Sequence, residues 1–313
     1  MSLQKRSKIA IFGGSGFMGS WLTDLIKADH DVVSFDIQKK FSDYDPKRTA
    51  KILNFRKELL KGSKQYKGDV RNLKQVQQFL NKEKPEIIVF LASIPFANFE
   101  DKILQFSVEA TGVANLLKAN EKLNARIVYM SSLFAIGHFD HATTETTALE
   151  PRTHYGIGKA ASEHLIKSAS NNYGIIRTTS VYGAGDFNNR VPQIVIENAL
   201  TGKGHLRINK AALLDFIYIK DLVQGIKAVM FHDGNGVFNI SGGRAMTLVD
   251  FANAVEASLG KKLKYEIHAV DDRGRRGSLV NDKARLVLGW EPKFDLASGV
   301  KDTIAIYKEK IKI

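Results

Sequence analysis

The 313-residue sequence predicts an α/β fold, in which a doubly wound parallel sheet is joined to a smaller C-terminal α/β lobe. Over the first 180 residues, short apolar strands alternate with amphipathic helices, which is typical of βαβ units. Residues 86–92 are almost continuously apolar, as expected of a strand buried on both faces of a parallel sheet. A glycine-rich turn follows the first strand and precedes the first helix. These three observations define the fold class.

Each strand expected in this region is a short apolar run that stops at a turn residue. Asp36 ends the second strand, and Gly68-Asp69 ends the third. The expected strands cover residues 8–12, residues 31–35, the vicinity of Lys67, and residues 86–92, 126–130 and 175–177.

Helix-compatible stretches separate these strands, at residues 20–28, 46–61, 73–82, 103–119 and 155–170. Within residues 73–82, Val76, Phe79 and Leu80 share one face, which is the spacing of a helix packed on a sheet. Beyond residue 180 the alternation gives way to glycine-punctuated loops and short helices such as 247–259. We therefore expect a smaller and discontinuous second lobe.

Three glycines, Gly13, Gly16 and Gly19, lie at three-residue spacing between the first strand and the first helix. Gly13 permits a tight turn, Gly16 lets backbone N–H groups approach a phosphate, and Gly19 lets the helix pack closely on the strand. The helix N-terminus adds unpaired N–H donors and the positive end of its dipole. The motif predicts a Rossmann-type site for the pyrophosphate of a dinucleotide.

Asp36 ends the second strand 17 residues after Gly19, where a carboxylate accepts hydrogen bonds from the adenosine ribose. Such a carboxylate repels a 2′-phosphate and so favours NAD over NADP. Lys39 and Lys40 leave NADP open, because they could pair with that phosphate. Asp69 is expected at the adenine end of the same crevice. The alternative is that Asp69 is an ordinary turn residue that contacts no ligand.

A proton-transfer site is expected at Tyr155 and Lys159, which lie one helical turn apart on one face. A free tyrosine has a pKa of about 10, and a neighbouring ammonium group lowers that pKa by stabilising the phenolate. Tyr155 could then take a proton from a substrate hydroxyl while the carbinol carbon loses hydride. Ser132, after the strand at 126–130, would hold the reacting oxygen by a hydrogen bond.

Composition excludes several other functions. The sequence contains no cysteine, which rules out disulfides, thiol catalysis and cysteine-ligated metals and suits a reducing cytoplasm. It has no apolar run of membrane-spanning length. The net charge of +13 is spread over scattered lysines, so we expect neither a nucleic-acid nor a membrane partner, although an anionic substrate would be attracted. His138 and His141 lack a suitable carboxylate partner, so no metal site is expected.

Ordered motifs over nearly the whole chain resemble the extended short-chain dehydrogenase/reductase superfamily, particularly its NAD-dependent nucleotide-sugar epimerase/dehydratase branch. They are the glycine turn, Gly68-Asp69-Val70-Arg71, Leu91-Ala92, Met130-Ser131-Ser132, Tyr155-Gly156 through Lys159, Ile176-Arg177, Val181-Tyr182-Gly183, Asp215 through Asp221, Phe238-Asn239-Ile240 and Leu288-Gly289-Trp290-Glu291-Pro292.

The resemblance implies roles for individual residues. Ser132, Tyr155 and Lys159 form the catalytic triad. The cofactor site then also includes Phe17, Met18, Val70, Leu91, Ala92, Ser93, Tyr155 and Lys159, with Lys159 as the anchor of a cofactor ribose. The substrate contacts are Ser132, Ser180, Asn189, Arg190 and Arg276, with Asn189 on the substrate diphosphate. A homodimer that pairs the helices after Ile103 and Tyr155 is also usual in the superfamily.

Departures from the family pattern reduce the number of reactions that the enzyme is expected to catalyse. Leu133-Phe134 stands where dehydratases carry an Asp-Glu pair, so a 4,6-dehydratase is not expected, and the glutamate of the decarboxylating relatives is missing as well. Leu214 replaces an arginine that binds diphosphate, and Ser180 replaces an asparagine. One lost charged hydrogen bond is worth about 1.5–3 kcal/mol. A nucleotide sugar would therefore need other cations, for which the candidates are Arg207, Lys210 and the cluster Arg273, Arg275 and Arg276.

The expected domains are an NAD-binding domain at residues 1–180, to which residues 211–245 return, and a substrate-binding lobe mainly at residues 181–313. The first functional hypothesis is an NAD-dependent nucleotide-sugar epimerase of the 4-epimerase type. The second is an NAD-dependent dehydrogenase of a small hydroxy substrate, because Pro151-Arg152-Thr153-His154-Tyr155-Gly156 resembles threonine dehydrogenases. The third is a non-catalytic NAD-binding sensor or scaffold, against which the intact Ser-Tyr-Lys set argues.

Overall fold

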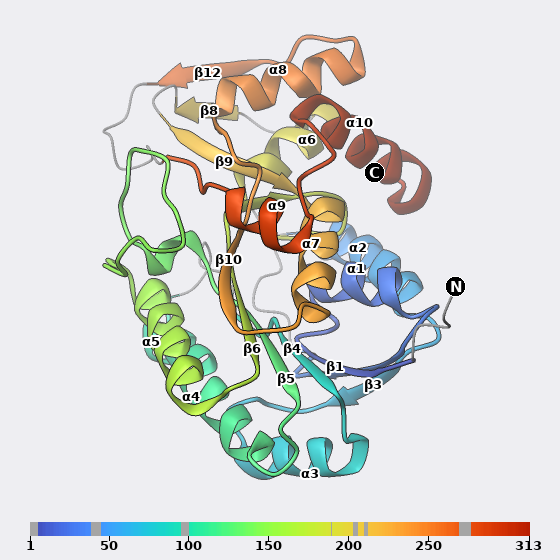
Figure 1. Cartoon of the computed structure of the whole chain (residues 1–313). Coiled ribbons are helices and arrows are strands. Elements are labelled where there is room, and N and C mark those ends of the chain that lie inside the picture. The colour runs from blue at the N-terminus through green and yellow to red at the C-terminus, as the bar shows by residue number, and fades with distance from the viewer. Residues whose placement is uncertain are drawn as a thin grey trace.

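The computed structural model describes residues 6–38, 45–94, 100–188, 190–202, 206–209, 212–268 and 277–313. A parallel seven-stranded sheet lies at its centre, in the order β10-β6-β5-β4-β1-β2-β3 (Figure 1). This order is that of a doubly wound Rossmann-type sheet, so the predicted fold class is confirmed. The strands are β1 (Lys8–Phe12), β2 (Asp31–Asp36), β3 (Lys64–Lys67), β4 (Ile87–Phe90), β5 (Arg126–Met130), β6 (Tyr173–Thr178) and β10 (Gly236–Ile240).

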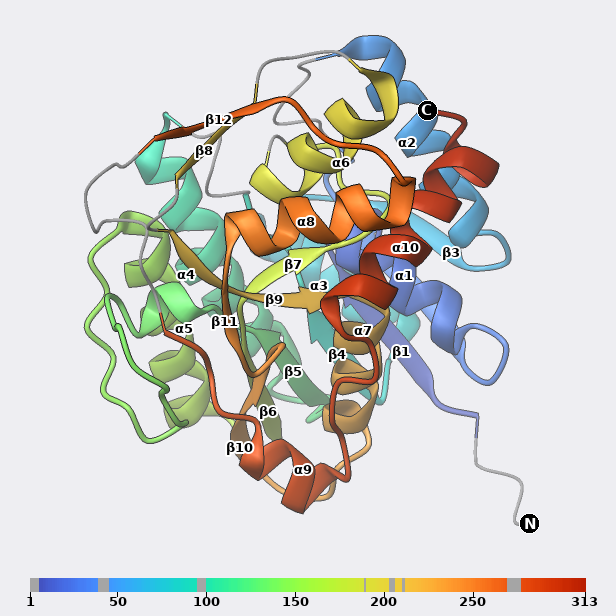
Figure 2. The same ribbon diagram turned by 90° about the horizontal axis from the view of Figure 1, so that it is seen from above.

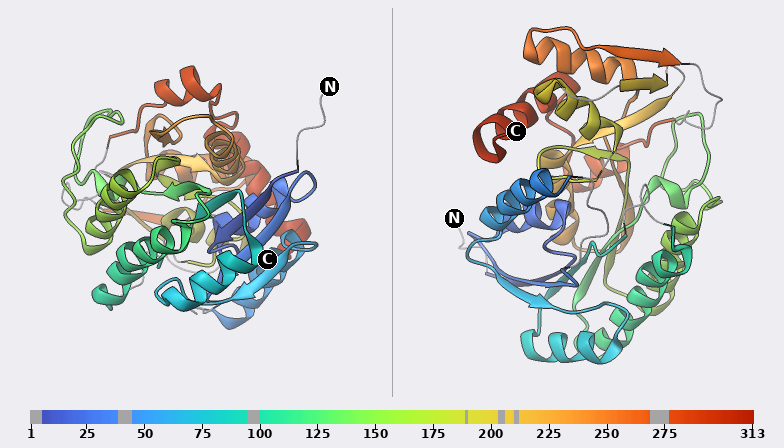
Figure 3. Two further views of the ribbon diagram at one scale, coloured as in Figure 1. Left: turned by 60° about the horizontal axis from the view of Figure 1, so that its bottom comes forward. Right: turned by 180° about the vertical axis from the view of Figure 1, so that it is seen from behind.

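Helices cover both faces of the sheet. Successive residues of a strand point to opposite faces, so a strand that is apolar throughout gives the sheet two apolar faces that must be covered. Ile11 belongs to one apolar layer and Phe12 to the other. The Phe12 layer contains α3 (Leu73–Glu83), α4 (Lys102–Asn120) and α5 (His154–Ala169). The Ile11 layer contains α1 (Phe17–Ile26), α2 (Pro46–Leu59) and α7 (Ile219–Met230). The right view of Figure 3 shows green α4 and α5 together, on the side away from blue α1 and α2.

The first helix begins at Phe17, three residues before the expected start at residue 20. Gly16 takes the extended N-cap conformation, so the helix starts inside the glycine motif. The glycines had suggested a longer turn, whereas in the structure they bring the helix N-terminus directly to the end of β1. This position is where N–H donors must lie to receive a phosphate.

Beyond β6, a second group of elements gathers at one end of the central sheet (Figure 1). A three-stranded sheet runs in the order β11-β9-β7, and a two-stranded sheet pairs β12 with β8. Figure 2 shows α8 across this group, where the Phe251 ring contacts the rings of Phe216 and Tyr182. The elements are β7 (Ser180–Tyr182), α6 (Val191–Thr201), β8 (Leu206–Asn209), β9 (Leu213–Tyr218), β11 (Ala245–Thr247), α8 (Leu248–Leu259), β12 (Tyr265–His268) and α10 (Leu296–Ile306). Helix α9 (Asp282–Leu288) instead contacts β10 of the central sheet.

No helix in the described ranges is both long and apolar enough to cross a membrane.

Candidate active site

A cavity of about 1090 Å³ opens where the strands β1, β2, β4, β5 and β6 end. In an open parallel sheet, ligands bind at these carboxyl ends. The cavity wall includes most of the residues that the sequence predicted, namely Gly13, Gly16, Phe17, Met18, Gly19, Asp36, Asp69, Val70, Leu91, Ala92, Ser93, Ser132, Tyr155, Lys159, Ser180 and Arg190. The predicted residues Asn189 and Arg276 lie outside the described residues, as do Lys39, Lys40, Lys210, Arg273 and Arg275.

The glycine turn forms a cradle that side chains would fill. Gly13 has a φ of +85°, and a Cβ there would lie 2.7 Å from the Ala92 nitrogen. A Cβ on Gly19 would lie 2.6 Å from the Gly14 Cα and would also meet the Gly13 carbonyl oxygen. The Gly16 N–H donates to the Gly13 carbonyl at 3.1 Å, which closes the turn. This close backbone approach fits the pyrophosphate of a dinucleotide.

Two aspartates lie at the ends of the neighbouring strands. The Asp36 carboxylate accepts hydrogen bonds from the backbone N–H of Ser15 at 3.1 Å and of Gln38 at 2.6 Å, so it joins the end of β2 to the glycine turn. Asp69 is paired with Arg71. Burial would raise the pKa of Asp69, but its hydrogen bonds from Arg71 outweigh that effect and lower the pKa. Both carboxylates are therefore held in place before any ligand binds.

Tyr155 and Lys159 face the cavity from the first turns of α5. The Thr153 hydroxyl caps this helix by accepting a hydrogen bond from the Gly156 N–H at 3.0 Å, and this cap fixes the helix start next to Tyr155. The Lys159 ammonium nitrogen lies 5.5 Å from the centre of the Tyr155 ring, and the Phe134 ring packs edge-on against the same ring. Ser132 lines the cavity just after β5. The structure thus brings the predicted acid/base, cation and hydroxyl groups to one wall.

Sequence reasoning missed the carboxylates behind this wall. Lys159 is 2% exposed and makes an ion pair of 2.9 Å with Glu109 of α4, which is 0% exposed. One turn beyond Lys159, buried Glu163 accepts hydrogen bonds from Ser131 and Arg177. A signal for Glu109 was present, because it is a charged residue on an otherwise uncharged face of the helix predicted at 103–119. The spacing of four residues from Lys159 was the signal for Glu163.

Part of the cavity lining is apolar. Leu133, Phe134 and Leu214 all line the cavity, and Phe134 does so beside the Tyr155 ring. Among the described residues of the wall, the only carboxylates are Asp36 and Asp69, both at the ends of the strands β2 and β3. The part of the cavity near Tyr155 therefore has no carboxylic acid among the described residues that line it.

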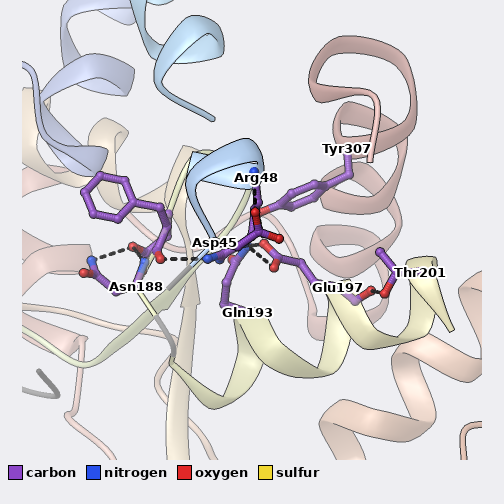
Figure 4. Close-up of polar contacts among 9 residues, drawn as sticks. Asp45, Arg48, Asn188, Gln193, Glu197, Thr201 and Tyr307 are labelled. Carbon is purple, nitrogen blue, oxygen red and sulfur yellow. Dashed lines mark hydrogen bonds and ion pairs between the residues drawn. The ribbon is translucent and has the colours of Figure 1, made fainter. Parts of the chain in front are cut away.

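Helix α2 holds the loop that precedes α6 against the cavity. The buried Arg56 donates to the Gly185 carbonyl at 2.6 Å and stacks over the Phe187 ring at 4.6 Å. Burial lowers the pKa of Arg56 to about 10. Arg48 donates to the Phe187 carbonyl at 2.9 Å and pairs with Glu197 of α6. Figure 4 shows the polar contacts around Arg48 and Glu197, in which Glu197 also contacts Gln193 and Tyr307.

A doubly wound sheet with a glycine cradle at the carboxyl ends of its strands defines a dinucleotide-binding protein of the Rossmann class. The comparison with known families then identifies it further. The family model "NAD dependent epimerase/dehydratase family" matches residues 9–241, and the chain belongs to that family. It is therefore an NAD-dependent enzyme of the extended short-chain dehydrogenase/reductase type, as predicted.

Similar proteins cover the chain from end to end. The UDP-glucose 4-epimerase of Lactobacillus helveticus is 25% identical, with 95% of each chain covered. The structure of a UDP-glucose 4-epimerase with UDP-glucose from Thermotoga maritima matches with a TM-score of 0.84 at 24% identity, covering 96% of this chain and 99% of the other. A dTDP-glucose 4,6-dehydratase from Bacillus anthracis in complex with NAD has a TM-score of 0.83 at 22% identity, covering 97% of both chains. The relatives thus include both epimerases and dehydratases.

Proposed function

We propose that this enzyme is an NAD-dependent nucleotide-sugar epimerase of the 4-epimerase type, acting through a transient keto-sugar. The observation that carries the proposal is the composition of the cavity wall. Ser132, Tyr155 and Lys159 line it together, whereas Leu133 and Phe134 offer no acid for eliminating water. Besides the cofactor, reversible oxidation at one carbon needs only Ser132, Tyr155 and Lys159. Elimination needs further acid and base groups, which favours epimerisation over dehydration.

Each residue of the set has a distinct task. Tyr155 removes the proton of the substrate hydroxyl and later returns it. The Lys159 ammonium, 5.5 Å from the Tyr155 ring centre, favours the phenolate by its charge. The Ser132 hydroxyl hydrogen-bonds to the reacting oxygen and holds it against Tyr155. NAD would be held against this set by the glycine cradle and Asp36, and would supply the reversible hydride acceptor for the carbinol carbon.

The glycine cradle and the two aspartates are the part of the wall that would hold NAD. The first turn of α1 supplies N–H donors for the pyrophosphate, and Asp36 supplies acceptors for the adenosine ribose. We further propose that the substrate is a nucleoside-diphosphate sugar, because the epimerase and dehydratase relatives carry nucleotide sugars in their names. Arg190, which lines the cavity, is the described cation closest in sequence to the expected diphosphate contact.

A second candidate is an NAD-dependent dehydrogenase of a small hydroxy substrate. Leu214 lines the cavity where an arginine would bind diphosphate, and this observation favours a smaller substrate without phosphate. A sensor or scaffold would bind NAD without converting any substrate.

Net NADH formation separates these candidates. The protein is incubated with excess NAD and either UDP- or dTDP-hexoses or, separately, small hydroxy substrates. We expect it to interconvert the sugars without a lasting rise in NADH absorbance with either substrate class. Product is measured by chromatography and NADH by its near-ultraviolet absorbance. NADH that accumulates in step with substrate loss would identify a dehydrogenase and contradict the epimerase. Bound NAD with neither change, across both substrate classes, would identify a sensor.

We also propose a homodimer formed through α4 and α5, which lie side by side (Figures 1 and 3). Their outer surfaces carry exposed apolar side chains, with Ile103 at 83%, Phe106 at 37% and Ile157 at 44% exposure. Covering these groups removes apolar surface from water. Sedimentation velocity is expected to give a particle of twice the chain mass, and Ile103→Glu to shift it toward the monomer. A wild-type monomer at micromolar concentration would contradict this proposal.

A cytoplasmic location belongs to the same proposal. It is supported by the absence of cysteine from the sequence, and cell fractionation tests it.

A further inference from the structure

A fully buried carboxylate lies directly behind the proposed catalytic lysine. Glu109 of α4 is 0% exposed and accepts hydrogen bonds from the Ser93 hydroxyl at 2.5 Å and the Tyr129 hydroxyl at 3.2 Å. Its Oε2 lies 2.9 Å from the ammonium nitrogen of Lys159. Lys159 also donates to the Met130 carbonyl at 2.7 Å. One carboxylate thus contacts α5, β5 and the cofactor-lining segment after β4.

The hydrogen bonds alone do not explain a charge at this position. Ser93 donates to Oε1 of Glu109 and Tyr129 donates to Oε2. A glutamine of the same length could accept one of these hydrogen bonds with its carbonyl oxygen and donate an amide N–H to the other hydroxyl, whereas burying a carboxylate carries a desolvation cost. What a glutamine cannot supply is a negative charge beside Lys159. The function of the charge is therefore to be found at the lysine.

Burial works against the charged form of Lys159. A fully buried lysine can lose about 3–5 pKa units, which would leave a neutral amine near neutral pH. Burial does act to lower the pKa of Lys159, but the charge of Glu109 is the largest opposing influence, and the pKa is raised overall. Tyr155 and Glu163 contribute in the same direction.

The other charged groups around Lys159 do not replace Glu109. Glu163, one turn along α5, is already paired with buried Arg177 at 2.8 Å and with Lys167 at 3.6 Å, so its charge is compensated. From β5, Tyr129 presents its ring to the Lys159 ammonium at 5.0 Å, and burial raises the pKa of this tyrosine. On the Tyr155 side, the described ring neighbour is Phe134, which has no charge. Among these neighbours, Glu109 is the carboxylate paired with Lys159.

We propose that Glu109 is a positioning residue that holds Lys159 as an ammonium ion beneath Tyr155, and that links it through Ser93 to the cofactor-lining segment. Glu109 itself does not line the cavity, so it acts through Lys159 rather than on the substrate. The inference rests on the proposed function in one respect, which is the role of Tyr155 as the acid/base. The charge state of Lys159 can be measured without any substrate.

The charge state of Lys159 in the full-length protein tests the proposal directly. Competitive labelling of amines with trace acetic anhydride over a pH series, read by mass spectrometry of the Lys159 peptide, reports the pKa of that one amine. We expect the wild-type value to lie above an ordinary lysine, and Glu109→Gln to lower it by about 2 units or more. Glu109→Asp keeps the charge and should retain most of the elevation. Tyr129→Phe is the matched control, because it removes a hydrogen bond to Glu109 and leaves the ion pair.

The phenolate of Tyr155 gives the second measurement. Near-ultraviolet titration of each protein, minus the same protein carrying Tyr155→Phe, isolates one of the nine tyrosines. A neutral Lys159 no longer stabilises the phenolate, so Glu109→Gln should move phenolate formation to higher pH while Tyr129→Phe leaves it unchanged. In the Lys159→Met background, where there is no ammonium to hold, Glu109→Gln should cause no such upward shift.

Every outcome bears on the proposal. An unchanged Lys159 pKa in folded, NAD-binding Glu109→Gln would overturn it, as would phenolate formation at lower pH in that variant. Should Glu109→Gln not fold, a wild-type Lys159 that titrates below an ordinary lysine overturns the proposal equally. None of these titrations requires sugar conversion. An enzyme that converts no nucleotide sugar yet shows the predicted shifts would contradict the proposed function alone.

Discussion

Replacing Tyr155 with phenylalanine is expected to leave NAD binding intact and to lower turnover by about 10²-fold to 10⁴-fold or more. The substitution removes one oxygen atom and keeps the ring, whose edge-on packing against Phe134 supports this wall of the cavity. The glycine cradle and Asp36 are untouched, so the cofactor keeps its contacts. The proton of the substrate hydroxyl, however, loses its acceptor beside the Lys159 ammonium.

The two effects are measured separately. Isothermal titration gives the affinity for NAD, and chromatography of the nucleotide sugars gives turnover. Tyr265→Phe on β12 is a matched control, because Tyr265 does not line the cavity and its variant should behave like wild type. Wild-type turnover by Tyr155→Phe would overturn the catalytic role assigned to this tyrosine.

Replacing Gly19 with alanine should weaken NAD binding by about 10-fold to 100-fold, which corresponds to about 1.4–2.8 kcal/mol. Gly19 lies in the first turn of α1, and a Cβ there would lie 2.6 Å from the Gly14 Cα and would meet the Gly13 carbonyl oxygen. Those atoms are backbone and cannot rotate away. The helix must therefore move off the turn that presents N–H donors to the pyrophosphate. The alanine's gain in helix propensity, about 1 kcal/mol at most, does not compensate for this displacement.

Gly202→Ala provides the control for this substitution. Gly202 ends α6 with a φ of +69° and has open space around its Cβ position. Its alanine variant should lose stability through backbone strain and keep its NAD affinity. Thermal unfolding with and without NAD separates the two quantities. Unaltered NAD affinity in Gly19→Ala would show that the cradle does not depend on close backbone packing.

Much of the fold follows from local sequence patterns. Apolar runs such as residues 126–130 and the amphipathic face of Val76, Phe79 and Leu80 predict strands and helices in the right order, because burial on a sheet imposes those periods. The start of α1 was placed three residues late, since a glycine-rich motif suggests a turn. The helix nevertheless begins there, because the extended Gly16 acts as its N-cap.

The buried ion pairs could not be predicted from local patterns, because the two members of each pair are distant in sequence. Glu109 pairs with Lys159 across 50 residues, and Arg48 pairs with Glu197 across 149. Neither pair shares a helix face or a strand, so no local period relates its members. The first pair depends on how α4 packs on α5, and the second depends on how the fold brings Arg48 of α2 to Glu197 of α6.

The sequence by itself determined the doubly wound sheet and the cofactor, and it predicted the glycine cradle and the Ser132, Tyr155 and Lys159 set, which line one cavity. Each depends on short-range spacing, and the topology of parallel strands brings their ends together. Only the tertiary structure decided how deeply Lys159 is buried and which charged groups surround it. Whether a lysine remains an ammonium ion depends on its burial and on the charges around it, and here the decisive charge comes from Glu109 on another helix.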